Sequence, residues 1–295
     1  MLPRNGQDWR RGGSSSDDVA VRVESSDGVN VAIHDFGGSG PRLLFSHATG
    51  FHAHCYEPIA TRLSSEFTSF GLDHRGHGET PRPDDWKVDW DCYGDDATVA
   101  AEALAPEGGL VAFGHSMGGA SLVMAALRNP ELFDVIVAFE PNIFPQMMGR
   151  PGDDPSPMVT AARNRRDTFD SFEAAIDNYA SKPPMQFFDP EILRAYVEYG
   201  FEPTDSSVTL RCAPEHEART FEMGATHDLF DRLPEIETRI VVVSGKVETE
   251  RSPAGIAQRV ADRLPNGTYI ELAAGNHLSP FINPDETADL IRSAV

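Results

Sequence analysis

Cysteine is scarce in this chain, and the few cysteines stand far apart. Among 295 residues there are three, Cys55, Cys92 and Cys212, and they form no C-x-x-C pair. An odd number at wide spacing argues against a disulfide framework and against a structural zinc site. His52 and His54 share one loop but lack nearby carboxylate or thiol ligands, so we predict no metal and no other cofactor. We expect a reducing, cytoplasmic location.

Basic residues are also in short supply. Lys and Arg number 25 against 46 Asp and Glu, which gives a formal net charge of −21. Such a surface repels nucleic acid and anionic membranes, so we expect neither as a partner. No apolar run is long enough to span a membrane, and no signal peptide is visible. Residues 1–18 are rich in Gly, Ser and charge and are interpreted as a disordered leader. The sequence leaves the oligomeric state open.

Short apolar runs alternate with helix-compatible segments over most of the chain. The strand-like runs are 19–24, 29–34, 43–46, 67–72, 110–113, 134–139, 240–243 and 268–272. The first two predict a hairpin, and the rest predict a mostly parallel sheet with helices on both faces. Between 142 and 234 the strand signal is weak and the pattern is helical. We therefore predict an α/β core, residues 19–141 and 235–295, with a helical cap at 142–234 inserted after the sixth strand.

The run Gly114-His115-Ser116-Met117-Gly118 stands between a strand-like segment and a helix-compatible one. Strand, sharp turn and helix form the context that turns a G-x-S-x-G pattern into a nucleophile elbow. The flanking glycines let the strand and the helix pack closely around a strained serine. We predict Ser116 as a nucleophile.

A serine hydroxyl needs a base, and its transition state needs oxyanion donors. His277 lies in the loop between the last strand and the last helix, where it can reach over the sheet edge, and is our predicted base. Backbone N–H groups of Met117 and of Thr49 are the predicted oxyanion donors, with Phe51 as the alternative to Thr49.

Two carboxylates compete for the role of the acid that orients the histidine. Glu140 ends an apolar strand, where an unpaired buried charge would be costly. Glu248 follows another strand but stands in a charged, exposed-looking stretch. We favour Glu140 and keep Glu248 as the alternative. Four residues are predicted to contact substrate: Phe51, His115, Phe144 and Met147.

At this point the chain resembles the α/β-hydrolase superfamily over nearly all of residues 19–295. The elbow at 114–118 looks like that of the family, and His47-Ala48-Thr49-Gly50 is similar to its His-Gly oxyanion loop, with Ala48 in place of glycine. Asp73 to Thr80 resembles a structural turn of the family. The resemblance implies an eight-stranded, mostly parallel sheet with a helical cap. Some members place the acid where Glu140 stands, 24 residues after Ser116.

The superfamily hosts several reactions. Its dehalogenases and epoxide hydrolases use an aspartate nucleophile, and a serine at 116 disfavours both. We expect a serine esterase that cleaves small apolar carboxylic esters through an acyl-enzyme. A C–C bond (diketone) hydrolase or a lactonase on the same triad stays open, as does a non-catalytic ligand-binding protein. The sequence does not name the substrate.

Overall fold

The computed structural model describes residues 21–146, 156–247, 249–250 and 252–295. The predicted leader, the substrate-contact candidate Met147 and the alternative acid Glu248 lie outside the described residues.

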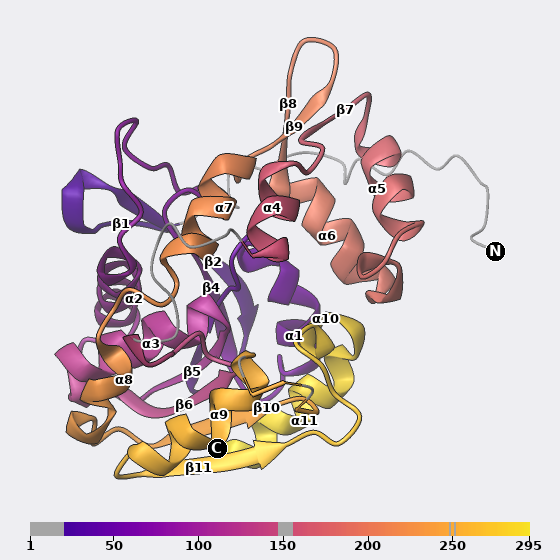
Figure 1. Ribbon diagram of the computed structural model, residues 1–295. Coiled ribbons are helices and arrows are strands. Elements are labelled where there is room, and N and C mark those ends of the chain that lie inside the picture. The colour runs from indigo at the N-terminus through magenta and orange to yellow at the C-terminus, as the bar shows by residue number, and fades with distance from the viewer. Residues whose placement is uncertain (1–20, 147–155, 248, 251) are drawn as a thin grey trace.

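A single large sheet forms the centre of the molecule (Figure 1). It has eight strands in the order β1-β2-β4-β3-β5-β6-β10-β11. The strand β2 runs antiparallel to both β1 and β4, and the other neighbours pair in parallel, so the predicted hairpin and the mostly parallel sheet are confirmed. The strands are β1 (Val21–Glu24), β2 (Asn30–Gly38), β3 (Arg42–Ser46), β4 (Thr68–Asp73), β5 (Leu110–His115), β6 (Phe133–Phe139), β10 (Ile240–Ser244) and β11 (Gly267–Glu271).

Helices cover both faces of the sheet because successive strand residues point to opposite sides. In β3, Leu44 belongs to one apolar core, whereas Leu43 and Phe45 belong to the other. The first core is completed by α2 (Trp90–Leu104), α3 (Met117–Arg128) and α9 (Pro253–Arg263). The second is completed by the short 3-10 helix η2 (Ala53–Tyr56), α1 (Glu57–Arg62), α10 (Ser279–Ile282) and α11 (Pro284–Ala294). Within the described ranges, no helix is both long enough and apolar enough to cross a membrane.

Most of the described segment between β6 and β10, which includes the predicted cap, lies over one end of the core, whereas its last helix, α8 (Leu229–Arg232), lies beside α3 (Figure 1). Its helices are α4 (Pro157–Arg163), α5 (Phe172–Ala180), α6 (Pro190–Gly200), α7 (Pro214–Met223) and α8 (Leu229–Arg232). The side chains of Ser156, Ser171 and Asp189 cap α4, α5 and α6, each by accepting a hydrogen bond from a first-turn N–H. Each of these residues marks the start of a helix within the stretch that the sequence pattern predicted to be helical.

The cap also contains a small antiparallel sheet that the sequence pattern did not predict. Its strands are β7 (Thr168–Phe169), β8 (Phe201–Pro203) and β9 (Val208–Leu210), in the order β7-β9-β8. Strands of two or three residues are too short to show apolar alternation, so the segment looked purely helical.

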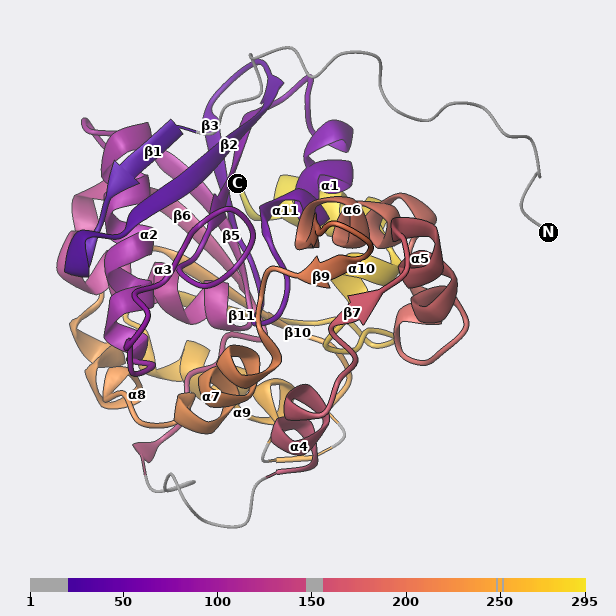
Figure 2. The same cartoon turned by 90° about the horizontal axis from the view of Figure 1, so that it is seen from above.

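The apolar interior of the cap is continuous with one of the two cores. Phe188, Ile192 and Phe201 of the cap belong to the same buried cluster as Tyr56 and Phe281. Figure 2 shows α6 beside α1, and α6 also contacts η2. A backbone hydrogen bond of 2.8 Å from Asp189 N to Phe281 O adds to this contact. This part of the segment between β6 and β10 is therefore packed onto the core through apolar side chains.

Candidate active site

Ser116 occupies a sharp turn between β5 and α3. Its backbone has φ 54° and ψ −112°, a conformation that L-residues rarely adopt. The turn is held from both sides, because Ser116 N–H donates to Phe139 O at 2.9 Å and Asn142 N–H donates to Ser116 O at 3.1 Å. Strain at a position fixed by its neighbours is typical of functional sites. The predicted strand–turn–helix elbow is therefore present around Ser116.

The glycines of the motif are required by close backbone contacts. A Cβ at Gly118 would lie 2.0 Å from the carbonyl oxygen of Ser46, and one at Gly114 would lie 2.6 Å from Gly118 O. Both obstacles are backbone atoms, which cannot move aside as a flexible side chain can. The strand β3, the elbow and the start of α3 thus approach each other only because these positions lack side chains.

Glu140 and His277 form a hydrogen-bonded pair next to the elbow. His277 Nδ1 donates to Glu140 Oε2 at 2.7 Å. The Glu140 side chain is almost fully buried, whereas that of His277 is 38% exposed. This contact uses Nδ1 of the ring and leaves Nε2 as the nitrogen that can accept a proton. The arrangement is the one that a histidine base oriented by a carboxylate requires.

The Glu140 carboxylate is fixed on its other side by the neighbouring strand. Gly245 N–H donates to Glu140 Oε1 at 2.8 Å, and Glu140 N–H donates to Val243 O at 2.7 Å. Glu140 itself has φ 41°, a second strained position beside Ser116. Gly245 N–H and His277 Nδ1–H therefore both donate to the one buried carboxylate. The contact with Gly245 was not predicted, because it joins residues 105 positions apart in the sequence.

Among the described residues, hydrogen bonds join His277 to Glu140 but not to Ser116 Oγ. Hydrogen bonds of catalytic groups are often long in the free enzyme and shorten when substrate binds. Ser116 and Glu140 are nevertheless neighbours in space, since Ser116 N–H bonds to the last residue of β6, directly before Glu140.

The loop from His47 to Phe51, here called the oxyanion loop, follows β3. Gly50 N–H donates to His77 Nε2 at 3.1 Å, and Phe51 N–H donates to Ala48 O at 3.1 Å. Thr49 N–H has no hydrogen-bond partner in the part of the chain that the structure describes. This difference favours Thr49 over Phe51 as the oxyanion donor.

A buried histidine at the start of the oxyanion loop fixes the backbone of that loop. His47 Nε2 accepts from His74 N–H at 3.0 Å, which leaves Nδ1 to donate to Ala48 O at 2.9 Å. Burial lowers the pKa of His47 to about 3, so the ring is neutral at ordinary pH. The neutral ring can therefore keep both bonds.

Met117 is the first residue of α3 and lies directly after Ser116. The first N–H groups of a helix have no partner within the helix. Their partial positive charge favours an anion at this end. The predicted role of Met117 N–H as an oxyanion donor agrees with this position.

The predicted substrate contacts have different environments. Phe51 is half-buried, and its ring packs in tilted contacts against Phe281 and against Tyr196 of α6, with ring centroids 4.4 Å and 5.4 Å away. Phe144 is half-buried against the core on the α3 face. His115 is fully buried, and both ring nitrogens bond to protein groups, Tyr56 Oη and His277 O. No ring nitrogen of His115 is left for a substrate.

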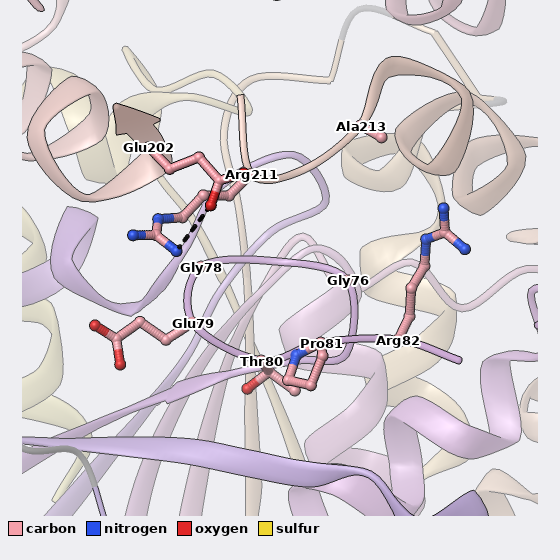
Figure 3. Close-up of a pocket in the computed structure, with 9 residues that line it drawn as sticks. All are labelled: Gly76, Gly78, Glu79, Thr80, Pro81, Arg82, Glu202, Arg211 and Ala213. Atoms are coloured by element: carbon pink, nitrogen blue, oxygen red, sulfur yellow. Dashed lines mark ion pairs between the residues drawn. The ribbon is translucent and has the colours of Figure 1, made fainter. Parts of the chain in front are cut away.

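A separate surface pocket lies between the loop after β4 and the cap (Figure 3). The residues lining this pocket are Gly76, Gly78, Glu79, Thr80, Pro81, Arg82, Glu202, Arg211 and Ala213. Arg211 and Glu202 form an ion pair of 3.7 Å on one side of it. None of the candidate catalytic or oxyanion residues lines this pocket, so we give it no part in the reaction.

No group of three or more His, Cys, Asp or Glu within the described ranges is arranged to hold a metal ion.

Comparisons with known proteins agree with this architecture. Residues 43–290 match the sequence profile of the Alpha/beta hydrolase family. The 2-(acetamidomethylene)succinate hydrolase of Mesorhizobium japonicum is 26% identical over 260 residues, which is 88% of this chain and 89% of that protein. The pFDCC methylesterase MES16 of Arabidopsis thaliana is 27% identical over 206 residues, 67% of this chain and 72% of that protein.

A solved structure extends the likeness to three dimensions. The crystal structure of E-2-(acetamidomethylene)succinate hydrolase superposes with a TM-score of 0.73 at 23% identity, covering 93% of this chain and 98% of that one. At that identity the superposition supports the fold alone, whereas the profile match spans most of the chain. The chain therefore belongs to the alpha/beta hydrolase family and is a hydrolase.

Proposed function

We propose that this hydrolase cleaves carboxylic esters of small apolar molecules through an acyl-enzyme on Ser116. The observation that carries the proposal is the Glu140–His277 pair beside the elbow, in which the buried Glu140 Oε2 lies 2.7 Å from His277 Nδ1. His277 Nε2 takes the proton of Ser116 Oγ as the oxygen attacks the substrate carbonyl. His277 then gives this proton to the leaving alcohol.

The oxyanion formed in this step needs donors that are already in place. Met117 N–H at the start of α3 and Thr49 N–H in the oxyanion loop supply them in our proposal. Water, activated by His277, next attacks the acyl-enzyme and releases the acid. Residues 142–234 act as the cap that shapes the substrate pocket, with Phe51 and Phe144 as apolar contacts, while the predicted contact Met147 falls outside the described residues. The three free cysteine thiols support a reducing, cytoplasmic location.

The name of one relative suggests a second candidate, hydrolysis of a small substrate that carries carboxylates. The relative from Mesorhizobium japonicum is named for a succinate derivative. A largely buried cation, Arg165, lies in the cap close to the oxyanion loop, since its partner Glu217 would touch a Cβ at Gly50. Glu217 already neutralises that cation at 2.6 Å, so an acidic substrate would have to compete for Arg165. This is why we place the apolar ester first.

The test uses the purified full chain with p-nitrophenyl acetate and butyrate, beside 2-(acetamidomethylene)succinate, a lactone and a diketone. We expect ester turnover and covalent labelling of Ser116 by a fluorophosphonate, with both lost in Ser116→Ala. If Ser116 is labelled but only one of the other substrates is turned over, the ester proposal is wrong and the reaction is hydrolysis of that substrate class. Absence of both labelling and turnover would refute the serine hydrolase mechanism.

A further inference from the structure

A buried chain of hydrogen bonds joins the oxyanion loop to the backbone of the candidate base. Ala48 N–H donates to Tyr56 Oη at 3.2 Å, and Tyr56 Oη lies 2.9 Å from His115 Nδ1. His115 Nε2 lies 2.8 Å from His277 O. Both Tyr56 and His115 are fully buried. Four separate segments, the oxyanion loop, η2, the end of β5 and the His277 loop, meet in this chain.

The direction of every bond follows from the last acceptor. The carbonyl oxygen of His277 can only accept, so the proton of His115 stands on Nε2. Nδ1 of the neutral ring is then an acceptor and takes the hydroxyl proton of Tyr56. The oxygen of Tyr56 keeps a lone pair for Ala48 N–H. One tautomer of His115 therefore satisfies all four groups.

The environment keeps both rings neutral. Burial is the main cause and unfavourable electrostatic interaction with the nearby His277 ring the second, and together they lower the pKa of His115 well below 6.5. Burial also raises the pKa of Tyr56 well above its usual value of 10. Aromatic packing holds the two rings in place, with Tyr56 and Phe281 centroids 5.2 Å apart and His115 and Phe281 centroids 5.3 Å apart.

We propose that Tyr56 and His115 are positioning residues, which fix the His277 loop and the oxyanion loop at one relative placement. The inference rests on the proposed function, because the two loops carry the base and the Thr49 donor. Ala48 is the residue before Thr49, and the bond to His277 is made by its own carbonyl. Misplacing a catalytic group by about 1 Å can cost about 10²-fold in rate. We therefore expect loss of these hydrogen bonds to lower kcat and to leave substrate binding unchanged.

The two ends of the imidazole can be separated by substitution. In His115→Gln, the amide nitrogen reaches the place of Nε2 and can still donate to His277 O. In His115→Asn, the side chain reaches only the place of Nδ1 and the bond to His277 O is lost. Tyr56→Phe keeps the ring and removes the hydroxyl. We expect kcat for the ester to fall by about 10- to 100-fold in His115→Asn and Tyr56→Phe, with KM within about threefold. His115→Gln keeps the bond to His277 O but loses the acceptor for Tyr56, so we expect a smaller fall than in His115→Asn.

Tyr93→Phe is the matched control. Tyr93 is a fully buried tyrosine whose hydroxyl lies 2.9 Å from Thr220 Oγ1, outside the chain of bonds. We expect it to lose stability as Tyr56→Phe does but to keep wild-type kcat. If Tyr93→Phe and Tyr56→Phe lose kcat equally, Tyr56 acts only through stability and the proposal is wrong. Wild-type kcat in His115→Asn would overturn the proposal as well.

Hydrogen exchange gives a readout that does not depend on turnover. We expect faster amide exchange in both segments 47–52 and 273–279 in His115→Asn, and no change there in Tyr93→Phe. Unchanged exchange in both segments would overturn the positioning role even if the wild-type chain proved inactive on esters. An inactive wild type with the expected exchange pattern would instead refute the proposed function alone.

Discussion

Glu140→Gln replaces one of the two carboxylate oxygens, both of which accept hydrogen bonds, by an NH₂ group that can only donate. Gly245 N–H and His277 Nδ1–H approach the carboxylate from opposite sides, at 2.8 and 2.7 Å. An amide can accept from one of them only, and its NH₂ group must face the other. If the amide oxygen stays with Gly245, His277 is driven to the tautomer with its proton on Nε2, which cannot accept the proton of Ser116.

The size of the effect follows from this tautomer change in a buried site. Loss of the equivalent carboxylate in a serine triad costs about 10⁴-fold in kcat, which corresponds to ~5 kcal/mol of transition-state stabilisation. We expect Glu140→Gln to lower kcat by about 10³- to 10⁴-fold, with KM little changed. Glu140→Asp keeps the charge but is one methylene shorter, so we expect a smaller loss.

The assay is steady-state hydrolysis of the best p-nitrophenyl ester, with urea unfolding to show that each variant is folded. Glu248→Gln is the control, because Glu248 was the rival acid in the sequence. We expect this variant to stay within about threefold of wild type, because Glu140 holds the role of the acid in our proposal. The reasoning is refuted if Glu140→Gln keeps kcat within tenfold, and the role passes to Glu248 if the two variants exchange their effects.

Two further predictions concern stability. Gly118→Ala places a Cβ 2.0 Å from Ser46 O, so we expect the free energy of unfolding in urea to fall by about 2 kcal/mol; a change under about 0.5 kcal/mol would contradict the close-contact argument. Burial lowers the pKa of His47 to about 3 and of His52 to about 4, so the unfolded chain binds more protons below pH 6.5. Each histidine should lower the free energy of unfolding by ~1.4 kcal/mol per pH unit from pH 6.5 down to its folded pKa. A free energy of unfolding that does not change between about pH 7 and 5 would contradict this prediction.

The sequence predicted those parts of the site whose signal is local. Ser116 stands between a recognisable strand and helix, and Glu140 is a charge directly after an apolar strand. Both inferences needed only the residues on either side. The strands of the main sheet were predicted for the same reason, since each shows either a short apolar run or an apolar–polar alternation within its own few residues.

The parts that were missed depend on residues far apart in the chain. Tyr56 and His115 are 59 positions apart, and His115 and His277 are 162 apart, so no window of sequence contains either contact. His115 was predicted to contact substrate, but it is fully buried and both of its ring nitrogens bond to protein groups. The strands β7, β8 and β9 failed for a different reason, since elements of two or three residues carry no period.

The continuous apolar cluster shared by cap and core limits how substrate can enter. Swinging the whole cap away would expose Phe188 and Ile192 of the cap together with Tyr56 and Phe281 beneath them. Fully burying one such side chain is worth about 1.5–3 kcal/mol, so separating several at once would cost a large part of the stability of an ordinary domain. The shared cluster therefore holds α6 against the core and disfavours a movement of the whole segment away from it.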